Sequence, residues 1–169
     1  LSSYLPETPI AWTSIITGKN AGKHGVFDWG ERAEGSYELG VVLSASCKES
    51  ALWDILGKGG KKVGIFNVPI TYPPRALNGF LVSGFDTPST KVCFTHPPSL
   101  SEELRFRVKD YVLAVREAYT RGNERRYVDG LLYALEKKEE AALYVMDRYD
   151  VDFSLYVFME LDHLHHKLS

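Results

Sequence analysis

The sequence has few cysteines, no long hydrophobic run and no marked excess of either charge. Its 169 residues include 20 basic and 22 acidic side chains, which gives a formal net charge of −2. This balance offers no electrostatic basis for binding a nucleic-acid polymer or an anionic membrane surface. No apolar run reaches the roughly 18 residues of a membrane-spanning helix, and no secretory signal is visible. We therefore expect neither a nucleic-acid-binding nor a membrane protein.

The two cysteines, Cys47 and Cys93, lie far apart and form no Cys-x-x-Cys pair. This pattern favours free, buried thiols over a disulfide framework or a zinc ribbon. Free thiols persist in a reducing compartment, so we expect a cytoplasmic protein.

Short hydrophobic segments alternate with helical patterns along the chain, which is typical of α/β proteins. The expected helices cover residues 9–17, 50–56, 99–115 and 124–147, and the expected strands cover residues 63–68, 80–83 and 152–160. Gly18 is expected to end the first helix. These elements predict a three-layer α/β/α fold with a central, mainly parallel sheet.

Hydrophobic patterns also predict which surfaces are buried. Residues 152–160 are almost continuously apolar, which indicates a central strand covered on both sides. Ser99 and Glu102 form a capping-box pattern at the start of a helix. In the helix 124–147, the charged run at residues 136–140 is expected to face solvent. The expected buried face of that helix consists of Val128, Leu131, Leu132, Leu135, Ala142 and Met146.

An acid and three histidines occur together near the end of the sequence, in Asp162-His163-Leu164-His165-His166. Asp162 and His166 are four residues apart and would share one face of a helix. Carboxylate and imidazole are ordinary ligands of Zn²⁺. The pair also follows a predicted strand, and ligands of open α/β sheets bind at the carboxyl ends of strands. The alternatives are a solvated helix start capped by Asp162, or the remnant of an affinity tag.

Thr8 is expected to be the N-cap of the first helix, with Pro9 as its first helical residue. Its hydroxyl would lie at the positive end of the helix dipole, where an alkoxide or a phosphoryl group is favoured. Thr8 is thus a candidate nucleophile, and an ordinary helix cap is the alternative. In the following loop, Lys23 and His24 could contact a phosphate, or could belong to a structural turn.

Four segments taken together resemble the type I phosphodiesterase/nucleotide pyrophosphatase family of the alkaline phosphatase superfamily. The resemblance is closest to its prokaryotic, predicted-phosphodiesterase branch. The segments are residues 8–28, 52–74, 79–88 and 158–166.

The resemblance implies a hydrolase with two divalent metal ions, usually Zn²⁺, with Mn²⁺ as the alternative. Thr8 matches the family nucleophile, which also ligates one metal and forms a covalent phosphothreonine. Asp162 and His166 match an Asp-x-x-x-His pair that holds the other metal. The expected substrate is a small phosphodiester or a nucleotide.

The sequence departs from the family pattern in its ligand set. The family's complete site also needs an Asp ahead of the nucleophile, and no Asp precedes Thr8 here. It further needs an Asp-His pair and another His after the Asp-x-x-x-His pair, and residues 167–169 do not supply them. Ala11 occupies a position where many nucleotide pyrophosphatases carry a phosphate-contacting Asn. We therefore expect residues 1–169 to be a fragment of one alkaline-phosphatase-like catalytic domain. By itself this piece should bind metal weakly and show little turnover.

Several alternatives remain open at this point. A sulfatase would need a Cys-x-Pro-x-Arg-type motif, and neither Cys47 nor Cys93 is followed by one. A phosphomonoesterase or phosphomutase could use the same scaffold. A non-catalytic α/β domain could bind an anion or a partner protein. Exposed sheet edges could also drive association into oligomers.

Overall fold

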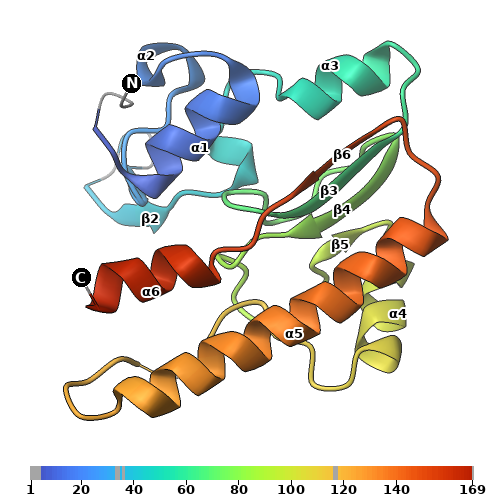
Figure 1. The fold of residues 1–169 in the computed structure, drawn as a ribbon. Helices are drawn as coiled ribbons and strands as arrows, with labels where there is room; N and C mark the ends of the chain where they lie inside the picture. The colour runs from blue at the N-terminus through green and yellow to red at the C-terminus, as the bar shows by residue number, and fades with distance from the viewer. Residues whose placement is uncertain (1–4, 33–34, 36, 116–117, 169) are drawn as a thin grey trace.

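A computed structural model describes residues 5–32, 35, 37–115 and 118–168, and Figure 1 shows its arrangement. The helices are α1 (Thr8–Thr17), α2 (Ala21–His24), α3 (Leu52–Lys58), α4 (Ser99–Arg107), α5 (Glu124–Arg148) and α6 (Glu160–Leu168), with a 3₁₀ turn at Ser44–Ser46. The strands are β1 (Gly30–Arg32), β2 (Leu39–Val41), β3 (Val63–Val68), β4 (Gly79–Ser83), β5 (Thr95–His96) and β6 (Phe153–Tyr156).

The main sheet has four strands in the order β5-β4-β3-β6. β3 pairs in parallel with both β4 and β6, whereas β5 runs antiparallel to β4. Every residue of β3 is buried, because strands and helices surround it on all sides. β1 and β2 form a separate antiparallel hairpin.

Helices cover both faces of this sheet (Figure 1). On one face, Phe66 and Phe80 pack against Leu100 of α4 and Val145 of α5. On the other, the opposite side chains of β3 pack against Ile16 of α1 and against Trp53 of α3. The expected three-layer α/β/α arrangement with a mainly parallel sheet is therefore confirmed.

The strand expected at residues 152–160 is shorter, and it is not central. β6 ends at Tyr156, pairs with β3 alone among the described residues, and is only half-buried. Val157 and Met159 are buried, but they belong to the connection into α6. They pack in the core cluster that contains Ile16 of α1 and Trp53 of α3. The continuous apolar pattern thus covers both the edge strand β6 and the buried connection that follows it. Hydrophobic periodicity cannot distinguish the two.

The buried face of α5 differs from the expected one. Leu131 and Ala142 are buried as expected, whereas Leu132 and Met146 are more than half exposed. Small residues allow α5 to approach the sheet closely, so the true face is not marked by the largest apolar side chains. The charged run is not wholly solvated either, because Lys138 is buried. The buried residues are Tyr127, Leu131, Ala134, Lys138, Ala141, Ala142 and Val145.

The helix expected at residues 99–115 ends at Arg107. Asp110 adopts a positive φ of 58°, which a continuing helix cannot accommodate. Tyr111 nevertheless reaches the core from the following loop. Pro98 occupies the N-cap position, so the capping box expected at Ser99 is wrong. Cys93 is exposed instead of buried, and both thiols are free.

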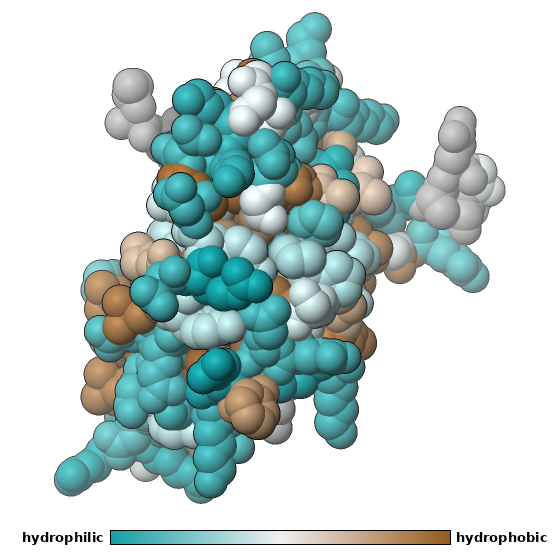
Figure 2. Space-filling view, turned by 90° about the vertical axis from the view of Figure 1, so that its right-hand side faces the viewer, coloured by the Kyte–Doolittle hydropathy of each residue, from teal (hydrophilic) through white to brown (hydrophobic). Residues whose placement is uncertain are grey.

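The surface at the end of the sheet where β6 begins is mostly hydrophilic, and its hydrophobic side chains form small separate groups (Figure 2). Among the described residues, no helix combines the length and hydrophobicity that a membrane crossing requires.

α1 begins at Thr8 itself, with Glu7 as N-cap and Pro9 in the first turn, so Thr8 is not the cap. The helix ends where expected, because Gly18 adopts the left-handed conformation with φ 65°. A buried histidine joins α1 to the next segment. The Val26 N–H donates to His24 Nδ1 at 3.1 Å, and His24 Nε2 lies 3.1 Å from Ser14 Oγ. The proton of the neutral ring is therefore on Nε2.

This arrangement predicts a pH-dependent stability. Burial lowers the pKa of His24, only partly opposed by the charge of Glu49. The unfolded chain then binds a proton that the folded chain does not, so the free energy of unfolding falls as pH drops below about 6.5.

Replacing His24 by Gln should cost about 1–3 kcal/mol at neutral pH, because it disrupts buried hydrogen bonds. It should also reduce the loss of stability between about pH 7.5 and about pH 5.5, measured by urea denaturation. His165→Gln, at an exposed site, is the matched control. A variant with the full pH dependence of the original chain would contradict this account.

Candidate active site

The carboxyl ends of β3 and β6 meet at one edge of the sheet, because the two strands are parallel. α6 follows β6 at this edge, and the start of α1 lies beside it (Figure 1). Between them is an open pocket of about 400 Å³. It is lined by Pro6, Glu7, Thr8, Trp29, Phe85, Tyr127, Asp162, His163, His166 and Lys167. The structure thus brings Thr8 together with Asp162 and His166 from opposite ends of the chain.

Asp162 and His166 lie on one face of α6, as their spacing predicts. Oδ1 of Asp162 is 3.6 Å from Nε2 of His166. Both side chains are open to solvent, with 47% and 70% of their surface exposed. Their oxygen and nitrogen atoms are therefore accessible to a ligand that enters the pocket.

His163 follows Asp162 in the sequence, but its side chain has a different environment. Its ring packs edge-on against Phe85, with centroids 5.4 Å apart, and its carbonyl accepts a long hydrogen bond of 3.5 Å from the Tyr127 hydroxyl. Burial lowers the pKa of His163, and the nearby Lys138 cation lowers it further. His163 is thus a mainly neutral ring that forms part of the pocket wall.

Thr8 is half-buried at the start of α1. The Ala11 N–H donates the first helical hydrogen bond to the Glu7 carbonyl at 2.9 Å, but the Glu7 side chain makes no capping hydrogen bond to the first turn. The hydroxyl of Thr8 therefore lies at the positive end of the α1 dipole, next to an uncapped helix start. Such a position stabilises negative charge on the hydroxyl or on an anion bound to it.

Lys23 and His24 are not among the residues that line this pocket. Lys23 is exposed on α2, whereas His24 is fully buried with both ring nitrogens engaged inside the protein. The structure thus favours a structural role for His24 over the phosphate contact that was one expectation.

Sequence reasoning missed the aromatic side of the pocket. Trp29 and Phe85 pack edge to face, with centroids 5.9 Å apart, and Tyr127 reaches the pocket from α5. Phe85 lies two residues after the end of β4, so its position at a carboxyl strand end was a usable signal. Trp29 and Tyr127 are brought in by loop and helix packing, which leaves no local pattern.

The described side chains do not form a complete metal site by themselves. Within residues 5–32, 35, 37–115 and 118–168, no three side chains of the His, Cys, Asp and Glu types are grouped so as to hold a metal ion. Asp162 and His166 have the ligand chemistry of a Zn²⁺ site, but such a site needs three or four ligands. The pair alone is therefore too few side chains to hold a metal ion.

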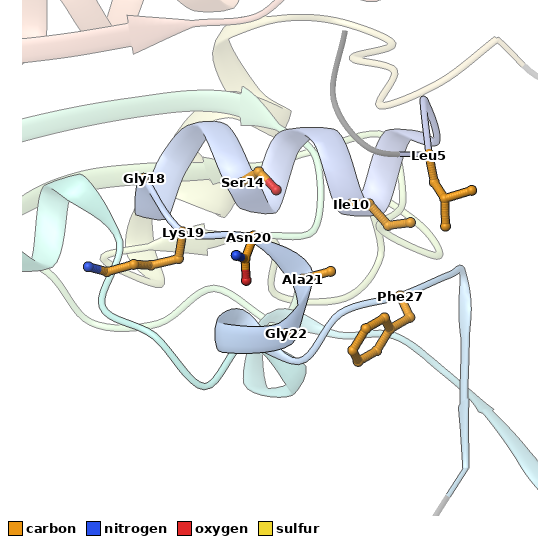
Figure 3. A pocket seen from close by; sticks show the side chains of 9 residues that line it. All are labelled: Leu5, Ile10, Ser14, Gly18, Lys19, Asn20, Ala21, Gly22 and Phe27. Atoms are coloured by element: carbon orange, nitrogen blue, oxygen red, sulfur yellow. The ribbon is translucent and has the colours of Figure 1, made fainter.

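A second cavity, of about 620 Å³, lies between α1 and α2 (Figure 3). Leu5, Ile10 and Phe27 make it largely apolar, and its polar groups come from Ser14, Lys19 and Asn20. None of the described residues that line it carries a carboxylate or an imidazole. The smaller pocket beside Thr8 is therefore the better candidate for chemistry, although the other cavity is larger.

A family model for type I phosphodiesterase/nucleotide pyrophosphatase matches residues 1–169, the whole chain. No curated protein and no solved structure gives a significant match. The matched family consists of hydrolases, which agrees with a pocket that joins a hydroxyl group to acidic and imidazole side chains. The chain therefore belongs to the type I phosphodiesterase/nucleotide pyrophosphatase family of enzymes.

Proposed function

We propose that this chain carries the nucleophile and part of the metal site of an enzyme that hydrolyses a small phosphodiester or a nucleotide pyrophosphate. One observation supports this most directly. Thr8, Asp162 and His166 line one pocket, although they come from opposite ends of the sequence.

In this proposal the Thr8 oxygen attacks phosphorus, and its proton is lost to solvent. A Thr8 Oγ–P bond forms as the bond from phosphorus to the leaving oxygen breaks. Water then attacks the phosphothreonine, which releases the phosphorylated product and restores the hydroxyl. The positive end of the α1 dipole favours the alkoxide in the first step and the leaving alkoxide in the second.

Asp162 and His166 are proposed to supply two ligands of a divalent ion, Zn²⁺ or Mn²⁺, and Thr8 a ligand of a second ion. Bound ions of this kind supply Lewis-acid charge stabilisation to phosphoryl transfer. The remaining ligands are not provided by the described residues, so the isolated chain should bind metal weakly and show little turnover.

The size and lining of the pocket indicate what kind of substrate would fit it. Its volume suits a small molecule, and Trp29 and Phe85 give it an apolar wall beside the charged groups. Ala11 has no hydrogen-bond donor in its side chain, so contacts to the phosphoryl oxygens must come from backbone N–H groups or from other side chains. A phosphomonoesterase would use the same Thr8, and the choice of assay substrate distinguishes the two.

Substitution of Thr8 tests the proposed nucleophile. In the full translation product of the gene, Thr8→Ala should lower hydrolysis of bis(p-nitrophenyl) phosphate by about a thousandfold or more, because no nucleophile remains. Thr8→Ser should retain part of the activity. Thr17→Ala, at the other end of α1, is the control. Undiminished turnover by Thr8→Ala would exclude this residue, and a preference for p-nitrophenyl phosphate would favour a monoesterase.

Metal binding by the isolated chain tests the proposed ligands. His166→Ala should weaken its affinity for Zn²⁺ by about tenfold or more, because a ligand is lost, whereas exposed His165→Ala should have little effect. Competition with a chromophoric chelator at neutral pH measures both. Equal losses for the two variants would contradict the assignment of His166 as a ligand. Robust hydrolysis by the isolated chain with added Zn²⁺ or Mn²⁺ would contradict the expected weak metal binding and low turnover.

A further inference from the structure

One ion pair in this structure is almost completely buried. Lys138 Nζ lies 2.7 Å from Glu160 Oε1, and only 2% and 6% of the two side chains are exposed. Lys138 comes from the middle of α5, and Glu160 is the first residue of α6. The pair therefore joins the long helix to the short helix that carries Asp162 and His166.

Stability alone does not explain such a pair. Removing two charges from water is costly, and well-packed apolar residues in their place are often equally or more stable. A buried pair does impose one arrangement, since separating its members leaves a buried charge uncompensated. Here two groups stabilise the Glu160 carboxylate: the Lys138 cation and the positive end of the α6 dipole.

Polar atoms around the pair are incompletely hydrogen-bonded. Glu160 Oε2 has no hydrogen-bond partner among the described residues, and neither has Nδ2 of buried Asn67. The Tyr111 hydroxyl donates to Asn67 Oδ1 at 3.3 Å. Burial raises the pKa of Tyr111, and the charge of Glu160 contributes to this rise. The Lys138 ammonium thus compensates the Glu160 charge at hydrogen-bond distance.

The orientation of α6 matters for the pocket. Each residue of an α-helix turns by about 100° and rises by about 1.5 Å. Glu160 therefore faces the interior, while Asp162 and His166 lie on the far side of the helix and line the pocket. A shift of one residue would turn both away from it. The same rotation would carry Glu160 away from Lys138 and leave two buried charges unpaired, which the protein interior disfavours.

We propose that the Lys138–Glu160 pair is a positioning element that fixes the rotation of α6 and so directs Asp162 and His166 into the pocket that contains Thr8. Both are positioning residues, because neither lines that pocket. The link to catalysis rests on the proposed function, whereas the effect on α6 does not.

The test compares Lys138→Met, Glu160→Gln and the double variant Lys138→Met/Glu160→Leu with the original chain. Hydrogen exchange of the α6 amides and thermal stability are measured on the isolated chain, and hydrolysis on the full translation product. Lys137→Met is the matched control, because it removes the Lys137–Glu140 pair from the same turn of α5, where 14% and 45% of the two side chains are exposed.

Both single variants should lower the exchange protection of α6 by about tenfold or more. The double variant should regain thermal stability, since no buried charge remains unpaired. Its α6 protection should stay low, and kcat should stay about a hundredfold down, because Asp162 and His166 are misplaced. Lys137→Met should change none of these quantities.

Two results would overturn the proposal. One is unchanged α6 protection in single variants that fold, and the other is a double variant that regains stability, α6 protection and kcat together. If Thr8→Ala retains activity while α6 protection falls as expected, the proposed function fails and the positioning role stands.

Discussion

Parallel pairing of β6 with β3 brings the two ends of this chain to one edge of the sheet. β3 is buried along its whole length and fixes the direction of both neighbouring strands. Because β6 must run the same way, α6 emerges at the carboxyl edge, where α1 begins. The shared pocket of Thr8, Asp162 and His166 follows from this pairing and not from any local motif.

Around that edge, charged groups are divided between two environments. Asp162 and His166 are open to solvent, where a ligand can reach them, while Lys138 and Glu160 are buried behind them. Half-buried His163 lies between, with its pKa lowered by burial. α6 thus has an inner side that holds it in place and an outer side available for chemistry.

Much of the fold could be predicted from the sequence, because strong local signals mark it. β3 matches its expected limits, and Gly18 ends α1 as expected. The rest depended on packing between distant segments. Neither the edge position of β6 nor the buried face of α5 is visible in a hydrophobic pattern, and Lys138 looks like part of a solvated charge run until Glu160 is placed beside it. For the site, spacing predicted the shared face of Asp162 and His166, while Trp29 and Tyr127 carried no signal.

The central claim is that Thr8 forms a covalent bond to phosphorus. The most direct measurement is mass spectrometry of the full translation product after a rapid acid quench during turnover of bis(p-nitrophenyl) phosphate. The account predicts an added aryl phosphoryl group on the peptide that contains Thr8, and its absence in Thr8→Ala. Turnover without any modified Thr8 under conditions that trap the intermediate, or modification of another residue, would contradict it.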